Sequence, residues 1–476
     1  MEHTTHTAMP MPHQNLLAGV NRRYRTLIPL TLVFIWAWFL WRPLFDLQTK
    51  LPWDQSSKSN QTQNDSNQTQ STPISWEGTK DIFDFPPIES EAIKSICDDV
   101  EWNSTLVFTC DNSYGGVGNI RNSVLNCVRY AISAGAGLVI PKIILRNSQN
   151  IMDLETGERT TLDYMFDVEH FVESLRLSCP ALKLYSTEGD IPNLEKSSDP
   201  ISVVPESLVE GKSRDGSAAL QNSDQWRQQF YQWLEQYATN NTEGPIIVYV
   251  GRLFLKYSVY SDGERFALEF GEILKVRSDA RELATTTLHA LIQAYSLRVN
   301  LTENILKNAF LGVHLRTEKD AMNAWGNPFW PFSTYKAIVA KYMEQIQDPS
   351  RPKTAVIYVA SGDLNEVGKF AGDVKALNMT VTTKDNLLTG KDKEDLEKLV
   401  WDQQALVDFL VMPMASDFAG LGISSFSWNI ALRRHFLAKQ KNFLHIDGPR
   451  MFEDEFSILY GGGKDKYPEY EACLWP

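Results

Sequence analysis

The spacing of apolar residues predicts alternating strands and helices from residue 104 onward. Residues 104–110 (STLVFTC) form a short run of β-prone residues, and a glycine-rich turn follows them. Residues 120–134 then carry apolar side chains at helical spacing, and residues 137–141 (GLVIP) predict a second strand. A strand, a helix and another strand in this order predict a βαβ unit, which places the two strands parallel in one sheet.

A second alternating series begins at residue 309. Its pattern predicts strands at 309–315, 354–360, 379–383, 409–413 and 442–446, separated by helices at 333–347, 364–377, 394–407 and 424–434. Between the two series, we expect helices at 166–175 and 279–299, a strand at 245–250, and loops over the polar stretch 186–224. Two such series predict an α/β protein with two Rossmann-like lobes facing a cleft, at residues 96–300 and 301–476.

An almost unbroken apolar run at 27–45 precedes these elements. Its length of roughly 19 residues is close to the number that crosses a bilayer. Arginines at 22, 23 and 25 stand before it, so the positive-inside rule places residues 1–26 in the cytosol and the rest of the chain in the lumen. A cleaved signal peptide is the alternative, although the run is long for one and no small-x-small cleavage site follows. We predict a single-pass type II membrane protein of the Golgi or endoplasmic reticulum.

Residues 46–95 are predicted to form a flexible stem, because much of this segment is too polar to build a core. N-x-S/T sequons begin in this stem at Asn60, Asn64 and Asn67, and in the head at Asn103, Asn240, Asn300 and Asn378. The five cysteines show no zinc-binding spacing and predict one or two disulfides in an oxidising lumen, with the connectivity open. The net charge of −13 argues against a nucleic-acid partner, since binding phosphates needs clustered Lys and Arg.

Four polar segments follow predicted strands, which is where open α/β sheets bind ligands. The first is the glycine segment at 115–119, with Gly116, Gly118 and Asn119. Its glycines allow a close approach to a ligand, and the helix that follows offers amides to an anion. A tight turn without a ligand explains the same residues.

The second segment is HLRTEKD at 314–320. In an extended strand His314 and Arg316 lie on one face, and an Arg fork there can hold a diphosphate through two hydrogen bonds. The alternative is an internal ion pair of Arg316 with Glu318 or Asp320.

The third segment, at 360–363, contains Ser361 and Asp363, and the fourth runs from Asp417 to Ser427 (DFAGLGISSFS). Asp363 is explained almost equally well as the N-cap of the next helix. Ser424 and Ser425 stand at a predicted helix start, where they would either cap the helix or bind a phosphate.

In this order and spacing, the motifs resemble those of the protein O-fucosyltransferase and α1,6-fucosyltransferase superfamily. The resemblance covers roughly residues 104–436, and HLRTEKD and SSFSWNIALRR are its most specific parts. It implies the GT-B fold, with the acceptor on the side of the first lobe and the nucleotide sugar bound mainly to the second. It also implies that Arg316 holds the β-phosphate and stabilises the GDP leaving group.

The resemblance further implies a set of nucleotide-sugar-binding residues: Gly116, Gly118, Asn119, His314, Arg316, Ser361, Asp363, Asp417, Ser424, Ser425 and Phe426. Among these, Asp417 and His314 would lie on the nucleoside side, and Gly118 and Asn119 would approach the fucose. We assign Arg316 and Glu318 as the catalytic pair. The identity of a general base stays open between Glu318, Asp320 and Asp111, and some members of the superfamily need none.

We therefore expect inverting transfer of fucose from GDP-fucose to a hydroxyl on a protein or glycan. No cofactor or metal is expected, because the sequence contains no D-x-D motif to clamp a diphosphate through a metal. Another nucleotide-sugar donor is a close variant. A type II sulfotransferase is disfavoured because GGVGNIRN lacks the Lys and Ser/Thr of a phosphate-binding loop. A catalytically degenerate transferase that binds glycans or scaffolds other transferases stays an alternative.

Overall fold

The computed structural model describes residues 81–147, 150–153, 156–208, 223–237, 244–251, 257–321, 332, 334–439, 450–461 and 473–476. The cytosolic tail, the anchor at 27–45 and most of the stem lie outside these residues, as does the strand expected at 442–446. Within the described part, no helix is both long enough and apolar enough to cross a membrane. The predicted topology is therefore neither supported nor contradicted by the fold.

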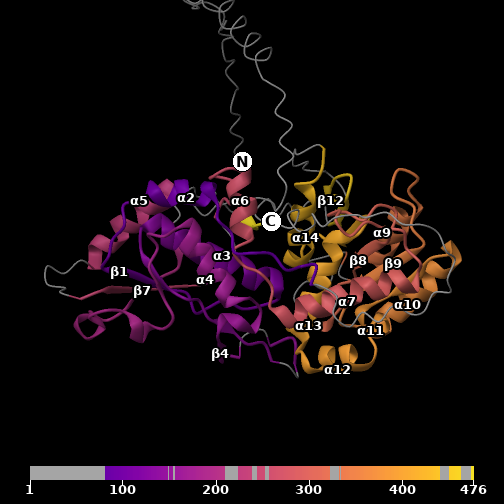
Figure 1. Ribbon diagram of the computed structural model, residues 1–476, viewed down its shortest axis with the longest axis horizontal. Helices are drawn as coiled ribbons and strands as arrows, with labels where there is room; N and C mark the ends of the chain where they lie inside the picture. Colours follow the sequence, from indigo (N-terminus) through magenta and orange to yellow (C-terminus); the bar gives the residue numbers. More distant parts are fainter. Residues whose placement is uncertain are drawn as a thin grey trace, which may run out of the picture. The chain divides into compact units, whose positions relative to one another are not determined.

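Two largely parallel sheets organise the described residues (Figure 1). The N-terminal sheet has the order β5-β2-β1-β7-β6 and contains β1 (Leu106–Thr109), β2 (Gly137–Val139), β5 (Leu184–Tyr185), β6 (Ile201–Val203) and β7 (Ile246–Val250), all paired in parallel. The C-terminal sheet has the order β10-β9-β8-β11-β13-β12 and contains β8 (Leu311–His314), β9 (Val356–Ala360), β10 (Thr380–Thr382), β11 (Asp417–Leu421), β12 (Arg450–Glu453) and β13 (Ser457–Tyr460). Its pairs are parallel except for β12 against β13. The predicted α/β fold is confirmed.

Helices connect the strands of both sheets (Figure 1). In the N-terminal half these are α2 (Glu91–Asp98), α3 (Val117–Ala134), α4 (Val168–Ser178), α5 (Ser223–Leu234), α6 (Glu264–Gly271) and α7 (Ser278–Ala294). In the C-terminal half they are α9 (Tyr335–Gln347), α10 (Leu364–Val374), α11 (Lys384–Leu387), α12 (Gly390–Lys398), α13 (Trp401–Val411) and α14 (Ser425–His435). Short 3₁₀ helices include η3 (Leu162–Tyr164) and η9 (Met412–Met414), and β3 (Ile143–Ile144) pairs with β4 (Arg159–Thr160) in a small antiparallel hairpin.

The central strands are short runs of mostly apolar residues. All residues of β1 (LVFT) and β9 (VIYVA) are buried. A parallel strand covered on both faces needs such a continuous apolar run, and this is why the two strands were readable from the sequence. The helix after β1 ends at Gly135, whose φ of 67° is left-handed and where a Cβ would lie 2.2 Å from the carbonyl oxygen of Glu101. Glycine is therefore required at that helix end.

One predicted strand is wrong. Residues 409–413 (FLVMP) complete α13 and enter η9, and the strand of this region is β11, which begins at Asp417. The residues from Leu406 to Val411 bury most of their side chains, and α13 packs against α7. A short apolar run is compatible with a buried helix as well as a strand, so the pattern alone did not separate the two. The strand β6, inside the stretch expected to be loops, was also missed.

Two disulfides join cysteines of the N-terminal half, Cys97 to Cys179 and Cys110 to Cys127. Their number agrees with the sequence prediction. Cys110 follows β1 and Cys127 lies in α3, so the second disulfide closes the segment that contains the glycine loop. Cys473 is buried and belongs to neither disulfide.

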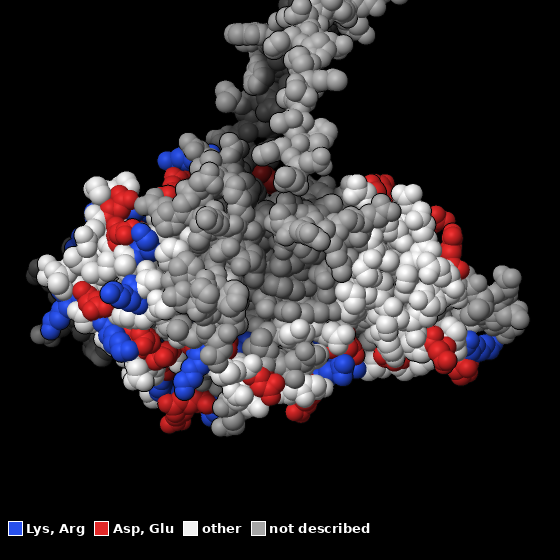
Figure 2. All heavy atoms as spheres, turned by 180° about the vertical axis from the view of Figure 1, so that it is seen from behind, with Lys and Arg blue, Asp and Glu red and all other residues white. Residues whose placement is uncertain are grey.

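On the face drawn in Figure 2, charged side chains of both signs lie mainly at the left and along the lower edge, while much of the described surface at the right is uncharged. Several form exposed ion pairs, such as Arg176 with Glu173 at 2.5 Å and Lys391 with Asp395 at 2.6 Å. Pairs of this kind contribute little to stability, because solvent screens them. Their main effect is to keep the surface hydrated.

The segment 473–476 follows the last strand of the C-terminal sheet but packs on helices of the N-terminal half. Trp475 is fully buried, with its ring centroid 4.7 Å from that of Phe270, and its Nε1 donates to Asn126 at 2.7 Å. Asn122 of α3 donates to the carbonyl of Cys473 and accepts from the backbone N–H of Trp475, both at 2.9 Å. The segment thus connects the two halves of the fold.

Replacing Trp475 with alanine should leave a large cavity beside α3 and remove the hydrogen bond from its Nε1 to Asn126. We expect Trp475→Ala to lower the free energy of unfolding by about 3–5 kcal/mol, as for other buried aromatic truncations. Urea denaturation followed by circular dichroism measures this change. The control is Tyr237→Ala, which truncates an aromatic side chain that is 47% exposed. Equal losses in the two variants would contradict the role of Trp475 as a packing anchor.

Candidate active site

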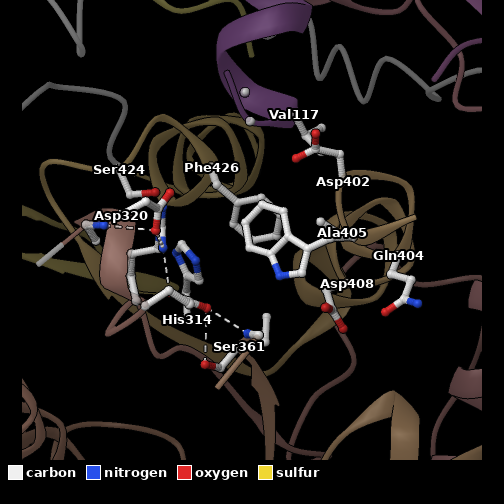
Figure 3. A pocket seen from close by; sticks show the side chains of 18 of the residues that line it. Val117, His314, Asp320, Ser361, Asp402, Gln404, Ala405, Asp408, Ser424 and Phe426 are labelled. Carbon is white, nitrogen blue, oxygen red and sulfur yellow. Dashed lines mark hydrogen bonds and ion pairs between the residues drawn. The ribbon is translucent and has the colours of Figure 1, made fainter. Parts of the chain in front are cut away.

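A cavity of about 530 Å³ lies where the strand ends of the C-terminal sheet meet the start of α3 (Figure 3). Its wall is formed by the glycine segment before α3, the residues after β8 and β9, one side of α13 and the start of α14. The volume is in the range of sites for small molecules and cofactors. Of the residues assigned to nucleotide-sugar binding, all except Asp363 and Asp417 line this cavity.

The glycine segment contributes Gly116, Gly118 and Asn119 to the cavity wall, and their binding of the nucleotide sugar stays a prediction. A Cβ on Gly118 would lie 2.7 Å from the backbone carbonyl carbon of Ser425, so only glycine allows this approach of α3 to α14. Ser425 Oγ donates to Asn119 Oδ1 at 2.5 Å across the same contact. The close approach between helices of the two halves explains the glycine at 118 more fully than a tight turn does.

The first turns of α3 and α14 both open onto the cavity without a capping side chain. The N-cap of α3 is Gly116, and the N-cap of α14 is Ser424, whose side chain makes no capping hydrogen bond. Helix N-termini carry partial positive charge and N–H groups without partners in the helix, which together bind anions. The side chain of Ser424 therefore does not cap α14 in the structure.

Arg316 lies in the cavity wall between two carboxylates. Its Nη1 donates to Glu318 Oε2 at 2.6 Å and to Asp320 Oδ1 at 2.8 Å, and its Nη2 donates to Asp320 Oδ2 at 2.5 Å. Its side chain is only 12% exposed. The internal ion pair that we considered as an alternative is thus present, and it places the guanidinium at the cavity.

Glu318 has both carboxylate oxygens engaged. Oε2 binds Arg316, and Oε1 accepts from the backbone N–H of Gly362 at 2.6 Å. Burial alone would raise the pKa of Glu318, but Arg316 and the Gly362 N–H outweigh this effect and lower it. The carboxylate is therefore ionised and positions Arg316, while its assignment as a catalytic residue stays a prediction.

Arg146 is a cavity residue that sequence reasoning missed. It follows β3, and its Nη1 donates to Asp320 Oδ2 at 3.1 Å while its Nε lies 3.4 Å from Asp402 Oδ1. Its guanidinium also lies over the ring of Trp401, 4.9 Å from the ring centroid. Arg316, Asp320, Arg146 and Asp402 form a row of alternating charges, which we call the ion chain. No motif surrounds Arg146, so the sequence offered no signal for it.

His314 and Phe426 lie together in the cavity wall. Their ring centroids are 4.6 Å apart, and His314 Nδ1 lies 2.7 Å from Ser427 Oγ. Burial lowers the pKa of His314 to about 3, so its imidazole is neutral at pH 7. A neutral ring suits contact with a ligand base or sugar and adds no charge to the phosphate site.

Two predicted binding residues lie outside the cavity wall. Asp417 is the first residue of β11 and pairs with Arg351, while Gln345 donates to it at 2.8 Å. Since β11 starts at Asp417, this side chain lies at the opposite edge of the sheet from the cavity, and its expected contact with the nucleoside is corrected. Asp363 caps α10 by accepting from Asn365 and Glu366, both at 3.1 Å. Ser361, from the same turn, does line the cavity.

The side of the cavity formed by α11 and α13 was not predicted, because the sequence pattern placed the helix and strand boundaries of this region differently. This side of the cavity contains Lys384, Trp401, Asp402 and Asp408. Asp408 accepts from Tyr358 at 2.7 Å and from Lys384 at 2.6 Å. Among the described residues, the wall carries three basic side chains (Arg146, Arg316, Lys384) and five acidic ones (Glu318, Asp320, Asp385, Asp402, Asp408).

Among the described residues, no group of three or more His, Cys, Asp or Glu side chains is arranged to hold a metal ion.

A model of the family described as GDP-fucose protein O-fucosyltransferase matches residues 106–437 of the chain. The chain belongs to this family. Every residue of the cavity wall lies inside the matched span. The protein is accordingly a GDP-fucose-dependent fucosyltransferase-like enzyme, and the resemblance that we drew from its motifs is confirmed.

Several solved fucosyltransferase structures are similar to this family member. POFUT1 in complex with GDP-fucose is 13% identical, with a TM-score of 0.42 over 76% of this chain and 99% of that chain. The fucosyltransferase NodZ from Bradyrhizobium is 14% identical, with a TM-score of 0.35 over 71% and 94%. A point mutant of Arabidopsis thaliana FUT1 in complex with GDP is 11% identical, with a TM-score of 0.36 over 72% of each chain. No curated protein matches the chain closely enough to count as a relative.

Proposed function

We propose that this O-fucosyltransferase family member transfers fucose from GDP-fucose to a hydroxyl on a protein or glycan, with inversion at the sugar and without a metal ion, between two GT-B lobes. The observation that carries the proposal is the position of Arg316. Its guanidinium shares one cavity with the uncapped N-termini of α3 and α14. These are the groups that a diphosphate leaving group requires.

The reaction would proceed in one displacement. The acceptor oxygen forms a bond to the anomeric carbon as the bond from that carbon to the β-phosphate oxygen breaks, which inverts the anomeric centre. Negative charge develops on the β-phosphate of GDP, and the hydroxyl loses its proton. Arg316 and the first-turn N–H groups of α14 would already be in position before the reaction, and they would stabilise the developing charge.

The proposal of a metal-independent reaction rests on which protein groups stabilise this negative charge. The sequence has no D-x-D motif, and the cavity offers a buried guanidinium and helix amides instead. Donors that are fixed before the reaction stabilise a leaving group without further reorganisation. The opposing N-terminal half, through Gly118 and Asn119, would then contact the sugar.

We further propose that the catalytic head lies in the lumen of the Golgi or endoplasmic reticulum, held by a single N-terminal helix. The two disulfides favour an oxidising compartment. Two head sequons also adopt a turn that presents their asparagine: Asn103 Oδ1 accepts from the N–H and hydroxyl of Thr105, and Asn300 does the same with Thr302. Asn300 and Asn378 are accessible at the surface, which leaves them within reach of a glycan-transferring enzyme.

The donor site predicts selective binding of guanine nucleotides. Calorimetry of the full-length protein in EDTA should show binding of GDP in preference to UDP, CMP and adenosine 3′,5′-bisphosphate. Arg316→Ala should weaken GDP binding by about 10–100-fold, because it removes charge-assisted hydrogen bonds to phosphate. Turnover of GDP-fucose should fall by about 10²–10³-fold. Arg316→Lys should also be impaired, since a point charge does not reproduce the fork.

The matched control is Arg176→Ala, which removes an exposed arginine of α4 paired with Glu173. It should bind GDP as the wild type does. Unchanged GDP binding in Arg316→Ala would refute the assignment of Arg316. A wild-type protein that binds none of the four nucleotides would instead support the degenerate, glycan-binding alternative.

The lumenal placement predicts N-glycans on the full-length protein isolated from cells. Glycopeptide mass spectrometry should find carbohydrate at Asn300 and Asn378. Removal of one glycan by an endoglycosidase changes the gel mobility of the protein, and each Asn→Gln change should abolish the part of this shift that one glycan produces. Unmodified asparagines at both positions would contradict a lumenal head.

A further inference from the structure

Asp402 differs from the other acidic residues of the cavity. It lies in the first turn of α13 and is 4% exposed, and Figure 3 shows its carboxylate beside Val117 at the start of α3. Its Oδ1 is buried and accepts no hydrogen bond from the described residues. The nearest cation is Arg146, whose Nε lies 3.4 Å away without forming a hydrogen bond.

The other four carboxylates of the wall are each hydrogen-bonded to a cation. Glu318 and Asp320 bind Arg316, Asp408 binds Lys384, and Asp385 accepts from Lys393 at 2.7 Å. Protonation of a carboxylate that is committed in this way would break its ion pair. By this comparison, Asp402 is the carboxylate among the described cavity residues that makes no hydrogen bond to a cation and keeps an oxygen without a hydrogen-bond partner.

The positions of Glu318, Asp320 and Asp111 limit the choice of general base that the sequence left open. Asp111 lies outside the cavity wall, with Lys142 3.5 Å from its Oδ2. Glu318 and Asp320 hold Arg316 in place and would release it on protonation. None of the three sequence candidates is therefore positioned to accept a proton in this cavity.

We propose that Asp402 is the general base, which takes the proton from the acceptor hydroxyl as that oxygen attacks the anomeric carbon. The inference rests on the proposed function. The oxygen–carbon bond forms, the bond from carbon to the β-phosphate breaks, the proton moves to Asp402, and GDP leaves with the electron pair. No oxidant or further reactant is needed.

The ion chain supports this geometry. Asp402 is separated from Arg316 by Asp320 and Arg146, so the proton acceptor and the leaving-group cation stand apart within one cavity. An in-line displacement requires this separation, because the hydroxyl and the phosphate lie on opposite sides of the reacting carbon.

The charged groups around Asp402 act on its protonation in opposite directions. Burial raises the pKa of Asp402 to about 6, Arg146 and Arg316 oppose the rise, and Asp320 adds to it. Tyr164 of η3 also faces Asp402, and its own pKa is raised by burial and by this carboxylate. At pH 7 Asp402 is mostly ionised and can accept a proton, and this capacity is lost as the pH falls through about 6.

The test measures single-turnover release of GDP from GDP-fucose by the full-length protein between pH 5 and 8. Water serves as the acceptor hydroxyl, because the natural acceptor is not identified. The wild-type rate should fall below a pH of about 6. Asp402→Asn should lower the rate at pH 7.5 by about 10²-fold or more and remove this pH dependence. GDP affinity, measured by calorimetry, should stay within about threefold of the wild type, which also reports that the variant is folded.

Two further variants test whether Asp402 acts as a general base or has only a structural role. Asp402→Glu keeps an ionisable group and should recover part of the rate together with a low-pH decline. Glu397→Gln, at an exposed position of the neighbouring α12, should leave rate and pH profile unchanged.

The proposal is overturned if Asp402→Asn stays within a few-fold of the wild-type rate, or if it retains the same pH profile. It is also overturned if the wild type binds GDP but releases none from GDP-fucose with water. A wild-type protein that does not bind GDP removes the proposed function itself, and the base assignment with it.

Discussion

The structure of the site depends on the charge of a buried arginine. Arg316 is nearly enclosed, and a guanidinium in that position requires anionic partners, which Glu318 and Asp320 provide at 2.5–2.8 Å. Each partner also holds another part of the cavity wall through hydrogen bonds. Glu318 holds the turn after β9 through the N–H of Gly362, and Asp320 holds Arg146, which comes from the hairpin of the N-terminal half. A phosphate that enters must therefore share or replace a carboxylate at Arg316, so donor binding is coupled to the arrangement of the whole ion chain.

The two halves of the fold contribute to one site because their backbones come into direct contact. Gly118 leaves room for Ser425, and Ser425 donates to Asn119, so the first turns of α3 and α14 meet at the cavity. A side chain at 118 would force these helices apart and remove one set of amides from the phosphate position. The buried segment around Trp475 also holds α3 in place, through hydrogen bonds to Asn122 and Asn126. Electrostatic preorganisation and packing thus act on the same pair of helices.

The sequence predicted the parallel sheets, and nine of the eleven residues that it assigned to nucleotide-sugar binding line the cavity, for identifiable physical reasons. The buried strands β1 and β9 are runs of mostly apolar residues. Residues at the carboxyl ends of parallel strands in one sheet lie close together, which brought His314, Ser361 and Ser424 to the cavity, and Gly118 joins them from the strand end of the N-terminal sheet. The errors came where an apolar run fits two structures. Because 409–413 was taken as a strand, Asp417 was placed after a strand end, when it begins β11 at the far edge. Arg146 and Asp402 could not be found from spacing, because only tertiary contacts place them beside Asp320 and Arg316.

The proposed mechanism requires that Arg316 and the start of α14 receive the β-phosphate of GDP. A crystal structure of the protein with bound GDP tests this directly. We expect a β-phosphate oxygen at about 3 Å from the Arg316 guanidinium and from first-turn N–H groups of α14, with the contacts of Arg316 to Glu318 or Asp320 loosened. GDP bound elsewhere, or bound in this cavity with its β-phosphate away from Arg316, would contradict it.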